Sequence, residues 1–191
     1  MKDIMQNGDS TLGIPVLDPF TADKLCHFGV LSNVKVVGLS TFEVNKADFS
    51  IITLMFNLDL YWPLITASAD YSIDVNDNAK INGKGEVDVA VHDFRFQISI
   101  NFKLKRGHIQ IDEITNMYVG LKALDFYVTG LYKDDKKNAK LSKMIANEVP
   151  KLINENQDKI VNTSIKFITE MFNKLLSNVN LSDIINHNKL I

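Results

Sequence analysis

Polar and apolar residues alternate without a break from Asp93 to Lys105, a run of thirteen residues. Side chains of a strand point alternately to its two faces, so all the apolar side chains of this run share one face. They are Phe94, Phe96, Ile98, Ile100, Phe102 and Leu104. The pattern predicts one antiparallel strand with an apolar face, roughly 40 Å long at ~3.3 Å per residue.

Further strands are expected on both sides of this run. We predict strands over 31–39, 50–61, 66–75, 87–91 and 109–118, and a strand followed by a turn over 120–131. Gly38 is expected at a bulge or bend, and Pro63 at a kink or a sheet edge, because proline donates no hydrogen bond to a neighbouring strand. The alternation slips by one residue before Phe94, which predicts a bulge or turn at His92 or Asp93.

The connections carry turn-forming residues. Turns or bends are expected at 76–78, 82–85 and 106–107. Residues 1–20 are expected to be irregular because Pro15 and Pro19 oppose a helix, and a short turn or helix could follow over 21–25.

Helical spacing replaces strand alternation after Asp134, with apolar residues at intervals of three and four. The pattern predicts one long helix over 137–178, with a weak turn at Asn156. Pro150 should kink or split this helix just before itself, because proline removes a backbone hydrogen bond. The part after Pro150 is about 40 Å long at ~1.5 Å per residue, and its apolar stripe has to be covered.

Strands first and a helix last indicate an α+β fold, with a long, strongly curved antiparallel sheet wrapped around a long C-terminal helix. We expect one domain over 1–191, with an irregular opening segment over 1–20, the sheet over 31–132 and the helix over 137–178. Such an architecture encloses an elongated apolar interior, which either holds a lipid or is filled by side chains.

Composition narrows the range of partners. The chain has 191 residues, 46% of them hydrophobic and 23% charged, with a net charge of −2 and a pI near 6.1. This balance gives no electrostatic footprint for a nucleic acid. No apolar run is long enough to span a membrane, and Met1–Gly8 lacks the apolar core of a signal peptide.

Cys26 is the single cysteine, so no intramolecular disulfide is possible, and we expect its thiol to be buried and inert. One cysteine fits a reducing compartment and equally a secreted protein with an adequate core. Glycosylation sequons begin at Asn162 and Asn180, and the sequence leaves their use open.

No pattern of residues points to catalysis or to a metal. A segment starting at Asp74 resembles a calcium loop, but Ala79 and Gly85 stand where such a loop needs glycine and glutamate. The four histidines lack the spacing of metal ligands, and neither a nucleophile motif nor a selected pair of carboxylates occurs. We therefore expect no enzyme activity, no catalytic residue, no metal and no cofactor.

Several short segments occur in a recognisable order. They are G-I-P-V-L-D-P over 13–19, L-S-N-V-K-V-V-G-L-S over 31–40, 71–73 with G-K-G over 83–85, and N-E-V-P over 147–150 with 154–158. Together, over about residues 13–180, they resemble the arthropod takeout and juvenile-hormone-binding proteins and the mite group 7 allergens. Takeout proteins usually carry an N-terminal cysteine pair, whereas this chain has Cys26 alone, which shifts the resemblance toward the group 7 allergens.

The resemblance implies a tubular lipid-binding fold, secretion, and non-covalent carriage of apolar molecules such as terpenoid hormones and fatty acids. The periodicity of polar and apolar residues, considered without the resemblance, already favours the same sheet and helix. We therefore expect a non-enzymatic carrier whose partner is an apolar small molecule held in an elongated tunnel; the oligomeric state stays open. The expected lining residues are Trp62, Phe94, Phe96, Ile98, Phe102, Phe167, Ile168 and Met171.

The alternative is an interaction protein with a closed cavity. It would act through a surface contact with a protein partner, a bacterial lipid or a membrane. Trp62-Pro63-Leu64 is the segment expected to form its exposed apolar tip.

Overall fold

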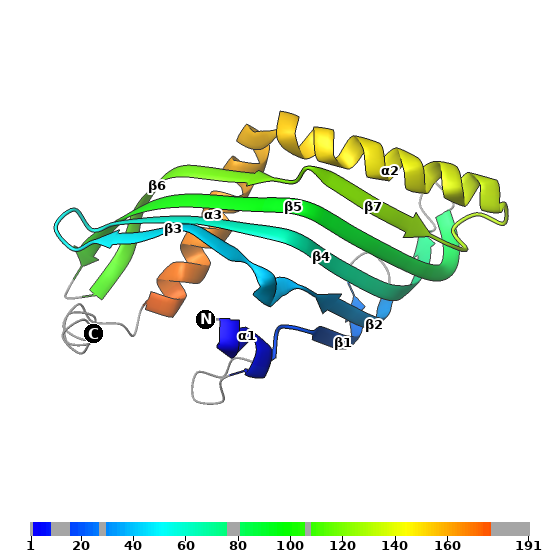
Figure 1. Ribbon diagram of the computed structural model, residues 1–191, viewed down its shortest axis with the longest axis horizontal. Coiled ribbons are helices and arrows are strands. Elements are labelled where there is room, and N and C mark those ends of the chain that lie inside the picture. The colour runs from blue at the N-terminus through cyan, green and yellow to red at the C-terminus, as the bar shows by residue number, and fades with distance from the viewer. Residues whose placement is uncertain (1, 9–15, 27–29, 76–80, 106–107, 177–191) are drawn as a thin grey trace. The chain divides into compact units, whose positions relative to one another are not determined.

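A large antiparallel sheet followed by two C-terminal helices forms the main part of the chain in a computed structural model (Figure 1). The structure describes residues 2–8, 16–26, 30–75, 81–105 and 108–176. Its seven strands are β1 (Phe20–Cys26), β2 (Val30–Val37), β3 (Glu43–Ser50), β4 (Met55–Val75), β5 (Ile81–Lys105), β6 (His108–Gly120) and β7 (Ala123–Val128). They pair in the order β1-β2-β4-β5-β6, with β3 beside β4 and β7 beside β5. The predicted α+β class is confirmed.

Two strands are much longer than an ordinary strand. β4 has 21 residues and β5 has 25, so the strands predicted over 50–61 and 66–75 are one strand, which starts at Met55. Pro63 lies inside β4 without ending it, and the bend predicted over 82–85 is part of β5. The predicted slip in alternation is confirmed at Asp93, whose φ of 51° lies in the left-handed region. A single residue in that conformation lets β5 continue while its faces exchange.

The prediction was wrong in three places before β4. Residues 2–7 form helix α1 (Lys2–Asn7), well before the prolines that were expected to oppose it. Residues 20–26 form β1, which pairs with β2 from Phe20↔Val36 to Cys26↔Val30, in place of a turn or helix. β3 was missed because most of its side chains are exposed, so it shows no apolar alternation. The expected bend at Gly38 is confirmed, since its φ is 97° before a short 3-10 turn, η1 (Leu39–Thr41).

The helical region is divided at Asn156 and not at Pro150. α2 spans Asp135–Glu155 with Pro150 buried inside it, and α3 spans Gln157–Leu176. The carbonyl of Asn156 accepts the first backbone hydrogen bond of α3 from Ile160, at 3.1 Å. Asparagine is a favoured residue at this capping position, so the weak turn noticed in the sequence is the true boundary.

Two compact units share the long strands. The first comprises Met1–Glu43, Tyr61–Phe94 and Gly120–Asn154; the second comprises Val44–Leu60, Arg95–Val119 and Glu155–Ile191. Each has its own helix, α2 in the first and α3 in the second.

In the first unit, buried polar side chains join α2 to β7. The Ser142 hydroxyl accepts a hydrogen bond from the Val128 amide at 3.1 Å. The Asn138 side chain bonds both the amide and the carbonyl of Tyr132, at 2.8 and 3.0 Å. These side chains satisfy backbone groups at the end of β7 and after it, which fixes where α2 begins on the sheet.

In the second unit, the core is built on three buried isoleucines, Ile98, Ile100 and Ile111. Packed against them are Phe56, Leu58, Phe96, Phe102, Ile114 and Ile168. α3 is held by amide side chains: Gln157 bonds both backbone groups of Val119, and Asn173 accepts the Ile111 amide at 2.8 Å. α3 therefore supplies side-chain hydrogen bonds to the backbone of β6 at Ile111 and Val119.

Candidate functional site

An apolar pocket lies between the sheet and α2 within the first unit. Its volume is about 210 Å³. Strands β2, β4, β5 and β7 contribute residues to it, and so does α2. The lining consists of Leu31, Tyr71, Ile73, Val87, Phe126, Val128, Leu131, Leu141 and Ile145.

Local periodicity explains why these side chains converge. Along β7, Leu124, Phe126 and Val128 are shielded whereas Asp125 and Tyr127 between them are exposed, as expected for a half-buried strand. On α2, Leu141 and Ile145 are four residues apart and therefore lie on one face of the helix. Met144, next to Ile145, is 55% exposed and is not among the lining residues.

Tyr71 carries the hydroxyl nearest to this pocket. Its side chain is 4% exposed, and the hydroxyl donates a hydrogen bond to the Thr129 carbonyl. Burial raises the pKa of Tyr71, so the phenol keeps its proton at neutral pH. Because its one donor is used by the protein and no charged side chain lines the pocket, the surface offered to a ligand is hydrocarbon.

Two of the eight predicted lining residues lie in an aromatic cluster of the first unit. The Trp62 ring is 5.7 Å from the ring of Phe42 and 5.5 Å from that of Phe94. Trp62 Nε1 donates to the Leu39 carbonyl at 2.9 Å, and the Lys2 ammonium lies 5.1 Å from the Phe42 ring. This cluster packs α1 and η1 against β4.

Four more predicted residues belong to the core of the second unit. They are Phe96, Ile98, Phe102 and Ile168. Phe102 also meets the ring of Phe49 at 6.2 Å. Phe167 lies on α3 with 67% of its surface exposed. Met171 is also on α3, but its side chain lies outside the described part of the chain, as does the Cys26 side chain on β1.

Sequence reasoning missed the residues of the apolar pocket. Among the described side chains, none of the eight predicted residues lines it. Two signals could have found it: the alternation in β7 and the Leu141/Ile145 spacing.

The predicted apolar tip is not a tip. Trp62, Pro63 and Leu64 lie within β4, and the Trp62 ring is packed between two phenylalanines. The turn between β3 and β4 is exposed instead, with Ile51 at 45% and Ile52 at 97%. Of the helices described, none has both the length and the apolar character needed to cross a membrane.

Comparison with known proteins agrees with this architecture. The sequence matches the family described as haemolymph juvenile hormone binding protein over residues 1–186. The fold is similar to the crystal structure of Takeout 1 from Epiphyas postvittana, with a TM-score of 0.63 and 12% identity over 96% of this chain and 89% of that one. No curated protein sequence matches the chain. Because the family match spans nearly the whole sequence, the chain belongs to the takeout-like haemolymph juvenile hormone binding protein family.

Proposed function

We propose that this protein is a secreted, non-enzymatic carrier of an apolar small molecule, such as a fatty acid, a terpenoid or a related lipid. The observation that carries the proposal is the pocket beside α2, which is lined by nine residues without a charged side chain. Membership of a family named for binding a hormone in haemolymph supports both the cargo class and the extracellular location.

The size of the pocket limits how much cargo it holds. A methylene is about as large as a water molecule, whose share of liquid volume is ~30 Å³. The volume of about 210 Å³ thus has room for about seven methylenes. At ~0.8 kcal/mol each they contribute about 6 kcal/mol, whereas micromolar affinity requires about 8 kcal/mol.

A longer cargo therefore needs additional apolar surface. The eight residues predicted from the sequence stay the proposed lining of an elongated tunnel, in one domain over 1–191. Burial of Ile98 and exposure of Phe167 mean that cargo binding would have to rearrange their surroundings.

The test is a pocket-filling substitution with a matched control on the same helix. Ile145→Trp places a large ring in the pocket, and Met144→Trp places the same ring on the exposed side of α2. A fluorescent fatty acid is titrated into each variant and then displaced with unlabelled fatty acids and terpenoids. Lipids extracted from the natively purified protein are identified by mass spectrometry.

We expect Ile145→Trp to weaken fatty-acid binding at least tenfold and Met144→Trp to leave it unchanged, because the first fills the volume that the chain would occupy. Circular dichroism and thermal unfolding confirm that both variants fold. Saturable binding that Ile145→Trp leaves intact would refute this pocket as the cargo site. No saturable binding together with an empty extract would refute the carrier function itself.

The exposed Ile51 and Ile52 favour one alternative, in which the protein acts through a surface contact with a lipid or protein partner. Cosedimentation with lipid vesicles tests the lipid contact, comparing the double variant Ile51→Ser/Ile52→Ser with Val44→Ser, an exposed control on β3. A loss of sedimentation that is specific to the double variant supports the contact. Equal sedimentation of the unsubstituted protein, the double variant and Val44→Ser refutes it.

A further inference from the structure

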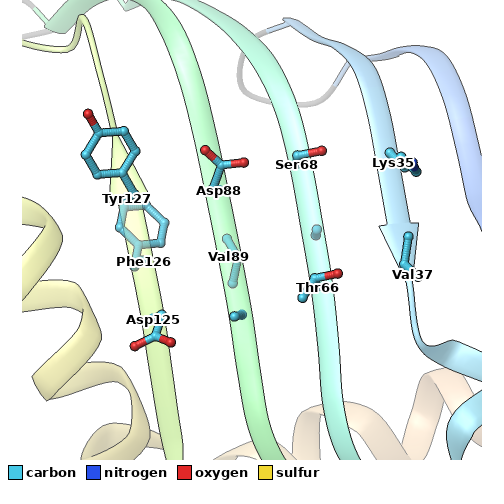
Figure 2. Close-up of a pocket in the computed structure, with 11 residues that line it drawn as sticks. Lys35, Val37, Thr66, Ser68, Asp88, Val89, Asp125, Phe126 and Tyr127 are labelled. Atoms are coloured by element: carbon cyan, nitrogen blue, oxygen red, sulfur yellow. The ribbon is translucent and has the colours of Figure 1, made fainter.

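A second hollow lies on the face of the sheet opposite the apolar pocket, again within the first unit (Figure 2). Its volume is about 440 Å³. Strands β2, β4, β5 and β7 form it. Its residues are Lys35, Val37, Thr66, Ala67, Ser68, Asp88, Val89, Ala90, Asp125, Phe126 and Tyr127.

The sheet register explains why the surface is hollowed there. Lys35 pairs with Ser68, and Asp88 pairs with Tyr127. Figure 2 shows these four side chains in one row across the four strands. In this row and the next, the shorter side chains of the two middle strands, β4 and β5, form the floor of the hollow. Longer side chains on β2 and β7 form its walls. The next row contains the pairs Val37↔Thr66 and Ala90↔Asp125.

The polar groups around the hollow are of mixed kind. Lys35 offers donors, Asp88 and Asp125 offer acceptors, and the hydroxyls of Thr66 and Ser68 can do both. Asp125 uses one oxygen in a contact of 2.8 Å with His92 Nε2. Within the described part of the chain, the side chains of Lys35, Asp88 and Ser68 form no hydrogen bond or ion pair with the protein. They are therefore available to a ligand.

Tyr127 adds an apolar surface at the wall. It is 55% exposed, and Asp88 lies directly across the strand pair from it. An exposed aromatic ring beside hydrogen-bonding groups is suited to a molecule with an apolar face and a polar edge.

We infer that this hollow is a second binding site, for a neutral polyhydroxylated molecule such as a sugar ring or a cyclic polyol. A hydroxyl group both donates and accepts, so it is complementary to a lining that holds an ammonium, carboxylates and hydroxyls together. An anionic ligand meets two carboxylates, and a cationic ligand meets Lys35. The C–H face of the ring lies on Tyr127 and its hydroxyls point to Asp88 and Ser68.

The experiment follows amide chemical shifts of the isotopically labelled protein during titration with glucose and with myo-inositol. Glucosamine and glucuronate are the charged comparisons, of either sign. Tyr127→Ala removes the aromatic wall, and Tyr132→Ala is the control, since Tyr132 is a 41%-exposed tyrosine outside the hollow. Asp88→Asn is a second variant that keeps the shape and removes the charge.

Saturable shifts are expected on β2, β4, β5 and β7 at millimolar sugar. Tyr127→Ala should weaken this binding at least tenfold, whereas Tyr132→Ala should not change it. Asp88→Asn should weaken it by a smaller factor, because the amide still accepts a hydrogen bond.

Three outcomes overturn the inference. The first is the absence of saturable shifts with both neutral ligands. The second is that Tyr127→Ala and Tyr132→Ala weaken the binding of neutral ligands equally. The third is that either charged sugar binds tenfold more tightly than the neutral ligands, since charge would then be what the site recognises. Displacement of a fluorescent fatty acid is a separate readout, so failure here leaves the carrier proposal standing.

Discussion

Affinity for linear fatty acids should rise steeply with chain length until the pocket is full, and the slope of this dependence should then change. The perturbation is a series of saturated fatty acids from six to sixteen carbons. Each methylene that enters the pocket beside α2 contributes ~0.8 kcal/mol, which is about a fourfold decrease in Kd. The pocket volume of about 210 Å³ holds about seven methylenes. The six-carbon acid already has four, so the steep part of this series covers about three further methylenes and should span on the order of two decades in Kd.

The dependence of Kd on chain length beyond this point distinguishes two arrangements of the cargo. If the remaining chain stays in water, Kd becomes independent of length after about seven methylenes. If it enters the proposed tunnel, Kd keeps falling at a similar rate up to about a dozen methylenes. Variants of Phe96 or Phe102 should then affect only the longer members of the series.

The assay is displacement of a fluorescent fatty acid below the aggregation concentration of each competitor. Methyl esters serve as head-group controls and should bind within about threefold of the acids, because the pocket presents no charged side chain to a carboxylate. A Kd that does not depend on chain length would refute the hydrocarbon pocket. So would a methyl ester whose Kd differs from that of its acid by more than several added methylenes change it.

Three further predictions concern stability. Ile100 is fully buried, so Ile100→Ala should destabilise the fold by about 2–5 kcal/mol in urea unfolding. The hydrogen-bonded Arg95 guanidinium holds the pKa of Asp59 at about 2. The stabilisation is therefore present above pH ~4 and is lost as the pH falls toward the folded pKa. Asp59→Asn should lower the free energy of unfolding by about 1–2 kcal/mol at pH 7, a modest amount because solvent screens the half-exposed Arg95. The difference between the two proteins should shrink to near zero by pH 2. Midpoints of urea unfolding measured across this pH range test both statements. Tyr71→Phe breaks the bond to Thr129 and should cost about 1 kcal/mol in thermal unfolding, while fatty-acid affinity should not decrease.

Much of the two long strands could be predicted, although not their full extent, because their central parts are half-buried. The alternation around Ile98 and Ile100 marks the core face directly, and the slip at Asp93 follows from counting. β3 gives no such alternation because most of its side chains are exposed. α1 is too short to show a helical period of apolar residues. The hydrogen bond missing at Pro150 did not end α2, and the helical region is divided instead at Asn156, whose carbonyl accepts the first backbone hydrogen bond of α3.

The pocket could not be located from the sequence, because filled and hollow interiors use the same residue types. Ile98 and Phe126 are equally apolar, yet one belongs to a closed core and the other borders a cavity. Beside Phe126, the polar side chains Asn138 and Ser142 of α2 hydrogen-bond backbone groups of Tyr132 and Val128, which ties α2 to the end of β7. Polar side chains that do not line the cavity therefore help to position the helix that borders it.

One short strand separates the two proposed sites. Phe126 lines both the apolar pocket and the polar hollow, whereas its exposed neighbours Asp125 and Tyr127 line the hollow alone, so the two sites meet at β7. β7 is fixed to β5 by six residue pairs, and Gly85 approaches it so closely that an added Cβ would lie 2.1 Å from the Thr129 carbonyl. A strand held this tightly cannot shift toward one face without displacing the other. Cargo that pushes Phe126 outward should therefore narrow the hollow, so that loading of the proposed cargo pocket should weaken binding at the proposed polyol site.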